Sequence, residues 1–467
     1  MNTLPLQPAR RFTRRSAIGL VALVAVTALF GVLLAFVRRG WPSAARHDRV
    51  VNTLLGRVLA DHPFARSGLA NIAALGRDTV MWWMVSVTAA GMLLRRQFRL
   101  TAFLVVTGLG ALALTPLAGH LAGWLVPAAS DGFPSRYALN ATVFYGAMLL
   151  VFLPIVPYPL RGLALGLMAA IVTVIGFAHL AVSGTRLSNV VAGGAVGLVW
   201  LTVTAHAFRL WRLETGRPVG RWADGLDPDA RPYLGPATTG PAHRVARPAL
   251  TLAVGWLALV GALYGLGALI TTHPPALDEA VPKWLAEHRT ARLSTLSELC
   301  SQAGGTRWIV AVAAVAAPLA IALTHHWRPG IFLIAVMLGE GGLFLALTTT
   351  VDRLRPTVSH LDGGLPTSSF PSGHTAAALC LYGALGVLLI PRTAGWKRCL
   401  VVLVATLVPV LVGLSRLYRG EHHPLDLLGS LLLAAGWLTV VTFVVHPNVH
   451  LDHRRATRHE HRDRLPA

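Results

Sequence analysis

Apolar runs of about 20 residues alternate with short polar connections along most of the chain. A helix needs a run of about that length to cross the hydrocarbon core of a bilayer, so the pattern predicts twelve membrane-spanning helices. They are centred on residues 16–37, 79–94, 101–117, 137–155, 162–181, 187–206, 249–271, 308–324, 331–348, 374–391, 398–415 and 424–445. The first run follows four arginines, but it is longer than the apolar part of a signal peptide, which predicts an uncleaved helix. The expected fold class is all-α, a polytopic membrane helix bundle.

The composition agrees with a membrane protein and excludes an ordinary soluble enzyme. Hydrophobic residues make up 54% of the 467 residues and charged residues only 13%, against roughly 25% charged residues in soluble domains. The net charge is +21, but the basic residues gather in the tails and a central linker and form no stripe with interleaved aromatics. We therefore expect contact with a lipid bilayer and no nucleic-acid partner. Cys300, Cys380 and Cys399 lie far apart and indicate neither a disulfide framework nor a metal site.

Basic residues in alternate connections orient the predicted helices, because cytoplasmic loops are enriched in Lys and Arg. Such residues occur after the predicted helices ending near residues 94, 155, 206, 324 and 391. With an even number of helices, both termini are expected in the cytoplasm of a bacterial cell, with the protein in the plasma membrane. Residues 38–78 hold seven arginines on the side that this count places outside, and they disagree with the assignment.

Two segments of the chain align without gaps. FPSRYALNATVFYGAMLL begins at Phe133 and FPSGHTAAALCLYGALGV at Phe370, an offset of 237 that also relates Trp200 to Trp437. Upstream the offset is 229, from Gly110 to Gly339, so the second copy holds eight extra residues. We interpret the chain as a tandem duplication, with two six-helix repeats that run parallel across the membrane.

Three polar clusters interrupt the second copy, and all fall on its predicted outer face. They are VDRLRP with Arg353 and Arg355, SSFPSGHT, which opens the helix near residue 374, and SRLYRGEHHPLD between the last two helices. Arginine forks suit phosphate oxygens. The small residues Ser372 and Gly373 at a helix N-terminus allow backbone N–H groups to approach an anion. Together with Arg355 and Arg416, they predict a phosphate-binding site.

Histidines in these clusters provide candidate chemistry. His422 and Asp426 are four residues apart and share one face of a helix. The carboxylate can hold one ring nitrogen and leave the other free to attack phosphorus. His374 can protonate the leaving alkoxide and then activate water. No step requires a metal or another cofactor. We expect a structural role for His423, which points to another face.

The order R-P, P-S-G-H and S-R-x5-H-x3-D resembles the type-2 phosphatidic acid phosphatase superfamily of integral membrane lipid phosphatases. The resemblance implies that His422 forms a phosphohistidine, that Asp426 orients it, that His374 is the acid and base, and that Arg355, Ser372, Gly373 and Arg416 hold phosphate. One position departs from the family pattern, because Thr348 stands where the family usually has a lysine. Arg353 is close in sequence and is a candidate to replace that cation.

The duplication and the resemblance together define the expected domains. Residues 1–206 form a degenerate, non-catalytic repeat, 207–247 a polar cytoplasmic linker, 248–446 the catalytic membrane domain and 447–467 a basic cytoplasmic tail rich in His and Arg. The first copy lacks the chemical groups. At the matching positions it has Ala118, Arg136, Tyr137, His179, Thr185 and Asn189.

The favoured function is hydrolysis of a lipid phosphate or a polyprenyl diphosphate at the extracytoplasmic face, without metal. Phosphatidic acid, phosphatidylglycerol phosphate and undecaprenyl diphosphate are the candidate substrates, and the sequence does not choose among them. A lipid transporter that keeps the fold and only binds the headgroup is the alternative, with Glu340 as its candidate pathway residue. A phosphotransferase that passes phosphate to another alcohol is a third possibility. The oligomeric state is open.

Overall fold

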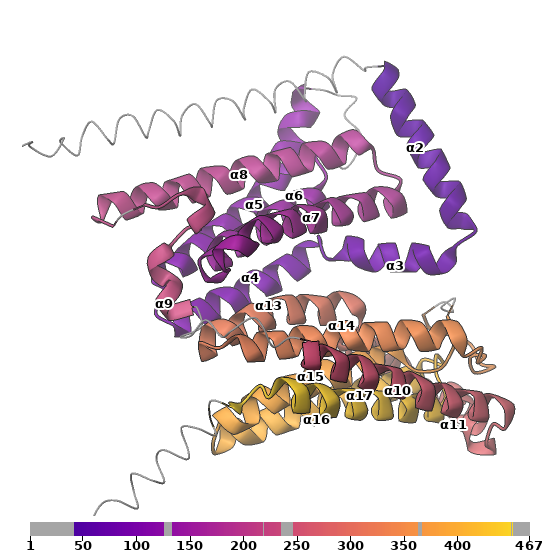
Figure 1. The fold of residues 1–467 in the computed structure, drawn as a ribbon. Helices are drawn as coiled ribbons and strands as arrows, with labels where there is room; N and C mark the ends of the chain where they lie inside the picture. The colour runs from indigo at the N-terminus through magenta and orange to yellow at the C-terminus, as the bar shows by residue number, and fades with distance from the viewer. Residues whose placement is uncertain are drawn as a thin grey trace, which may run out of the picture. The chain divides into compact units, whose positions relative to one another are not determined.

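The computed structural model describes residues 42–125, 133–217, 219–234, 246–362, 367–449 and 451, and every regular element among them is a helix. The chain divides into two compact units, residues 1–235 and 236–467 (Figure 1). The predicted helix at 16–37 lies outside the described residues. The protein is a polytopic helical bundle of the membrane.

The helices of the first unit are α2 (Pro42–Ala60), α3 (Pro63–Ala74), α4 (Asp78–Leu94), α5 (Phe98–Leu125), α6 (Arg136–Phe152), α7 (Arg161–Ser183), α8 (Leu187–Glu214) and the short α9 (Arg231–Leu234). Those of the second are α10 (Ala246–Thr272), α11 (Ala276–Glu287), α12 (Ala291–Ala303), α13 (Thr306–Thr324), α14 (Trp327–Thr350), α15 (Gly373–Leu389), α16 (Trp396–Tyr418) and α17 (Pro424–Val445). Five short 3₁₀ helices, η1 (Leu153–Ile155), η2 (Tyr158–Leu160), η3 (Trp222–Asp224), η4 (Pro228–Ala230) and η5 (Ile390–Arg392), complete the elements.

Ten apolar stretches of the described residues are long enough to cross a membrane, and each coincides with one of the predicted helices. The predicted helix at 79–94 corresponds to α4, an apolar helix of 17 residues that is shorter than these ten. The segments before α4 and before α13, which the hydropathy pattern predicts as connections, form α2, α3, α11 and α12. Charged and apolar side chains alternate along these four helices, so they contain no long apolar run and hydropathy does not predict them.

Equivalent helices and contacts recur in the two units. The offset of 229 relates the first residues of α5 and α14, and the offset of 237 relates those of α6 and α15 and those of α8 and α17. In the first unit, the indole N–H of Trp200 donates to the carbonyl oxygen of Thr107 at 2.8 Å, and the ring lies where a side chain on Gly110 would be. In the second, the indole of Trp437 donates to Val336 at 3.0 Å and packs in the same way on a glycine.

Phe370 anchors the loop that precedes α15. Its side chain is completely buried in the core of the second unit. A Cβ atom added at Gly429 on α17 would lie 2.2 Å from this ring, and one added at Gly267 on α10 would lie 2.9 Å from it. The two glycines therefore let the aromatic ring reach the inside of the bundle. This packing fixes Ser369 and the beginning of α15 in place.

The segment after α8 belongs to the first unit. Arg212, near the end of α8, is completely buried and forms ion pairs with Asp227 and Asp229. The amide N–H of Leu226 donates to the carbonyl oxygen of Leu150 at 3.1 Å. The amino-terminal part of the predicted 207–247 linker is therefore folded onto the first unit as far as residue 234.

Candidate active site

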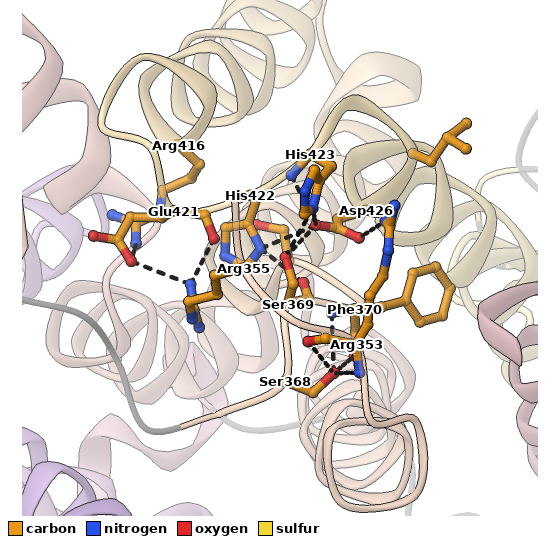
Figure 2. Close-up of polar contacts among 12 residues, drawn as sticks. Arg353, Arg355, Ser368, Ser369, Phe370, Arg416, Glu421, His422, His423 and Asp426 are labelled. Atoms are coloured by element: carbon orange, nitrogen blue, oxygen red, sulfur yellow. Dashed lines mark hydrogen bonds and ion pairs between the residues drawn. The ribbon is translucent and has the colours of Figure 1, made fainter. Parts of the chain in front are cut away.

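The three polar clusters predicted from the sequence meet at one end of the second unit (Figure 2). The first two lie in the connection between α14 and α15, and the third connects α16 to α17. Chain direction explains this meeting, because α14 and α16 end where α15 and α17 begin. The helices α11 and α12, which the sequence analysis missed, add side chains to the same region.

His422 is held as a neutral imidazole. Its side chain is buried, and its Nδ1 atom lies 2.7 Å from the carbonyl oxygen of Ser369. A carbonyl oxygen only accepts, so Nδ1 carries the hydrogen and the lone pair belongs to Nε2. Burial lowers the pKa of His422 to about 4; the positive charges of Arg355 and Arg416 act in the same direction, while Asp426 acts against them. The imidazole is therefore uncharged at neutral pH, as a nucleophile must be.

Asp426 is less close to His422 than the sequence predicted. Its Oδ2 atom lies 3.7 Å from Nδ1 of His422, beyond hydrogen-bond length, and the Ser369 carbonyl makes the hydrogen bond to this ring. The carboxylate accepts from the backbone N–H of His423 at 2.8 Å, from the hydroxyl of Ser369 and from the guanidinium of Arg353. Ser369 thus connects the two residues, because its hydroxyl donates to Asp426 and its carbonyl oxygen lies at hydrogen-bond distance from the ring of His422.

Arg353 links two buried carboxylates. Its guanidinium donates to Asp426 and to Asp278 of α11, and all three side chains are at most 5% exposed. Asp278 also accepts from the backbone N–H of Leu425 at 2.9 Å, in the first turn of α17. These contacts make Arg353 a candidate for positioning α17, and its replacement of the missing lysine stays a prediction. Thr348 itself is buried in α14 with an unpaired hydroxyl oxygen.

Arg355 and Arg416 lie on either side of the carboxylate of Glu421, which is completely buried. The Nη1 atom of Arg355 is 3.1 Å from Oε2 of Glu421, and Nη2 of Arg416 is 3.8 Å from the same oxygen. Nη2 of Arg355 also donates to the hydroxyl of Thr367 at 2.8 Å. The buried Nε and Nη2 atoms of Arg416 have no hydrogen-bond partner. Two guanidinium groups thus converge on the carboxylate of Glu421, and that of Arg416 has N–H groups without a hydrogen-bond partner.

Asp362 is a second carboxylate at this cluster. It accepts hydrogen bonds from Arg416 and from Arg419, and Nη1 of Arg416 also donates to the hydroxyl of Ser301 at 2.8 Å. Burial alone would raise the pKa of Asp362, but its hydrogen bonds with Arg419 and Arg416 outweigh this effect and the pKa is lowered. The carboxylate is therefore charged and occupies donors that suit a phosphate.

At the start of α15 lie Ser372, Gly373 and His374 of the cluster SSFPSGHT. Ser372 precedes the helix without capping it, because its hydroxyl is paired with Thr375 at 2.9 Å. A side chain on Gly373 would collide with the ring of Phe344, at 2.8 Å from the added Cβ. His374 in the first turn is within electrostatic reach of Arg416, His422 and Arg355. The predicted acid and base therefore lies at the same cluster as the predicted nucleophile.

The ring of His423 lies between the carboxylates of Asp426 and Glu279. Its Nε2 atom lies 3.0 Å from a carboxylate oxygen of Glu279, and its Nδ1 atom lies 3.3 Å from Asp426. Burial lowers the pKa of His423, but the hydrogen bonds with Asp426 and Glu279 raise it by more. Within the described part of the chain, no three His, Cys, Asp or Glu side chains are grouped to hold a metal ion.

The matching region of the first unit has a different construction. Tyr137 stacks on the ring of His179 at 4.0 Å between centroids, and Arg136 lies 3.7 Å from Asp78 at a well-exposed position. The backbone contact is shared, because the N–H of Ser135 donates to Asn189 as that of Ser372 donates to Asp426.

The second unit is thus a membrane helix bundle in which two arginines converge on the buried carboxylate of Glu421, next to a neutral histidine in the sequence. Residues 329–449 match the family model of the PAP2 superfamily, which confirms the resemblance found in the sequence motifs. The chain is 27% identical to phosphatidylglycerophosphatase B of Bacillus subtilis over 169 residues, which cover 36% of this chain and 82% of that protein. It is 34% identical to the undecaprenyl-diphosphatase BcrC of the same organism over 108 residues, 22% of this chain and about half (51%) of that protein.

A solved structure matches as well. The crystal structure of a transmembrane PAP2-type phosphatidylglycerolphosphate phosphatase from Bacillus subtilis has 25% sequence identity, covers 44% of this chain and 96% of that chain, and gives a TM-score of 0.34. The family and the two relatives, which are both phosphatases by name, support a phosphatase activity for this chain.

Proposed function

We propose that the second unit is a lipid phosphatase that works through a phosphohistidine on His422. One observation carries the proposal: a buried, neutral imidazole with Nδ1 bonded to a carbonyl oxygen lies at the same cluster as two converging guanidinium groups. A structural histidine has no need of such neighbours. The relatives act on a phosphatidylglycerol phosphate and on undecaprenyl diphosphate by name, so the substrate class proposed here is a lipid monophosphate or diphosphate.

In the first half-reaction, Nε2 of His422 attacks phosphorus. An N–P bond forms while the bond from phosphorus to the leaving oxygen breaks, and protonated His374 gives its proton to that oxygen. Arg355 and Arg416 hold the phosphoryl oxygens, and the uncapped N–H groups at the start of α15 add partial positive charge. In the second half-reaction, neutral His374 takes a proton from water, the water oxygen bonds to phosphorus, and the N–P bond breaks.

The proposed site faces the extracytoplasmic side, so that a lipid chain stays in the bilayer while its headgroup enters. Support comes from the basic residues Arg328, Arg392, Lys397 and Arg398, which lie at the opposite ends of α14, α15 and α16 from the site. Basic residues favour the cytoplasmic side. The termini are then cytoplasmic.

The test uses the purified chain in detergent with phosphatidic acid, phosphatidylglycerol phosphate and undecaprenyl diphosphate, and measures phosphate release with and without EDTA. We expect activity on at least one lipid, unchanged by EDTA, and a loss of at least about 10³-fold in His422→Ala, since the nucleophile is removed. His273→Ala, at an exposed histidine outside the site, is the matched control. Equal activity of His422→Ala and the control would refute the nucleophile.

A trapping experiment separates the two proposed histidine roles. With ³²P-labelled substrate, the His374→Ala variant should accumulate an acid-labile phosphoenzyme when the leaving group is good, because the water-activating base is missing. His422→Ala should show no label. Supplying glycerol or another alcohol tests phosphoryl transfer, since a transferase would form a phosphorylated acceptor instead of free phosphate.

A further inference from the structure

A cavity of about 880 Å³ lies in the first unit, at the turn between α4 and α5. The chain after α8 folds back over this turn, and α9 lies beside the end of α4 (Figure 1). One hydrogen bond ties the two parts together, because the guanidinium of Arg95 donates to the carbonyl oxygen of Tyr233 at 2.8 Å. The cavity has a volume in the range of small-molecule sites, about 300–1,000 Å³.

The cavity wall carries an excess of positive charge. Arg95, Arg96, Arg99 and Arg217 line it, together with two aspartates, Asp227 and Asp229. Both aspartates are paired with the buried Arg212, and the five arginines and two aspartates together leave a net charge of +3 at the cavity wall. Within the described residues, Arg96, Arg99 and Arg217 form no ion pair.

Three local features place positive charge at the turn that lines the cavity. Arg99 lies over the ring of Trp211, 5.2 Å from its centroid, and its buried Nη1 atom has no hydrogen-bond partner. Phe98 of the lining is the first residue of α5, and Gln97 directly precedes it. The first turn of α5 contains no acidic residue, so no carboxylate of this turn opposes the positive end of the helix dipole. Arg96 takes a left-handed backbone conformation at φ 56°, where a glycine is usual, which brings a guanidinium to the turn.

We propose that this cavity binds a phosphate-bearing anion, separately from the catalytic cluster. Several guanidinium forks and a helix N-terminus match the oxygens of a phosphate or diphosphate group better than they match a single carboxylate. The group belongs either to a lipid headgroup or to a soluble phosphate ester. The exposed rings of Phe98 and Tyr233 in the cavity wall suit the apolar part of either molecule.

The experiment counts bound probe molecules on the full-length chain by equilibrium dialysis. The probes are methylenediphosphonate, a non-hydrolysable soluble diphosphate, and the phosphonate analogue of dihexanoyl phosphatidic acid, a short-chain lipid whose C–P bond the proposed phosphatase does not cleave. We expect Arg96→Gln/Arg99→Gln to lose one bound molecule per chain of at least one probe. The loss of methylenediphosphonate identifies the free phosphate group as sufficient, and a loss confined to the lipid identifies a headgroup site.

The control is Arg221→Gln/Arg231→Gln, which removes the same charge from exposed positions of the same folded-back segment outside the cavity wall. It should keep the full number of bound molecules. The proposal is overturned if the cavity variant binds as many molecules of each probe as the unchanged chain, or if the control loses as many. Should the unfolding midpoint of the double variant fall, Arg217→Gln, at an exposed position, gives the same test.

This count also separates the present proposal from the phosphatase proposal. Binding at the catalytic cluster is unaffected by the change at Arg96 and Arg99, so the expected loss is one molecule whether or not that cluster binds the probe. The failure of His422→Ala to abolish phosphate release would leave this result unchanged.

Discussion

Removing Arg353 tests whether this side chain positions α17 or binds the substrate. The guanidinium lies between Asp426 and Asp278, and both carboxylates are at most 1% exposed. Arg353→Met keeps much of the apolar stem and deletes the charge, which leaves two carboxylates buried without their partner. Breaking a buried ion pair in this way costs about 3–5 kcal/mol, a large part of a typical free energy of unfolding of about 5–15 kcal/mol.

The assay is thermal unfolding in detergent, together with KM and kcat for the lipid substrate. A loss of this size lowers the unfolding midpoint by on the order of 10 °C in a unit of this size. A double-mutant cycle with Asp278→Asn, which lies outside the proposed phosphate site, should give a coupling free energy of at least about 1 kcal/mol. Arg398→Met, an exposed arginine, is the control and should change stability by less than about 0.5 kcal/mol.

The opposite result is equally clear. If Arg353→Met leaves the unfolding midpoint unchanged, shows no coupling with Asp278→Asn and raises KM, then Arg353 holds phosphate in place of the missing lysine. The interpretation of Arg353 as a positioning residue would then be wrong.

Three further predictions concern the second unit. Because burial lowers the pKa of His422 to about 4, the nucleophile of the free protein stays neutral as the pH falls, and kcat/KM should decrease only as the pH drops through about 4. A decrease of kcat/KM centred near 6.5, with substrate ionisation measured separately by ³¹P NMR, would contradict this. Asp362→Asn removes a carboxylate that competes with substrate for the proposed phosphate-binding arginines, so KM should fall about 3–10-fold, a gain of about 1 kcal/mol in binding free energy. The exposed control Asp352→Asn should leave KM unchanged. A raised KM in Asp362→Asn would refute the competition. Gly339→Ala puts a Cβ atom 2.1 Å from the indole ring of Trp437 on α17 and should destabilise the bundle by about 1–3 kcal/mol. Thermal unfolding measures this loss against the control Gly341→Ala, whose added Cβ atom meets nothing within 4 Å. Equal unfolding midpoints of the two variants would contradict the packing.

Hydropathy and motif order predicted most of the membrane helices and the residues that meet at the site. Both predictions depend on residues that are close in sequence. A run of about 20 apolar residues predicts a membrane-spanning helix by itself, and a motif consists of the very residues that it predicts for the site. Glu421 could not be predicted from such signals, because its burial between two arginines depends on how the connections that follow α14 and α16 fold together. Asp278 and Ser369 were missed for the same reason, as one lies on an amphipathic helix and the other contributes a backbone carbonyl.

Both units have a carboxylate that accepts a hydrogen bond from the start of an equivalent helix, although only the second unit has the candidate catalytic histidines. Asp48 accepts from the backbone N–H of Leu187 at the start of α8, as Asp278 accepts from that of Leu425 at the start of α17. A carboxylate that caps this helix is therefore compatible with a unit in which Ala118, Tyr137, His179 and Thr185 stand at the positions of Arg355, His374, Arg416 and His422. The second unit adds Arg353, from the connection that is eight residues longer, and this guanidinium joins the capping carboxylate to the one beside the histidine. The longer connection thus turns a helix cap into a support for the reactive imidazole, and exchanging single residues of the first unit would not supply it.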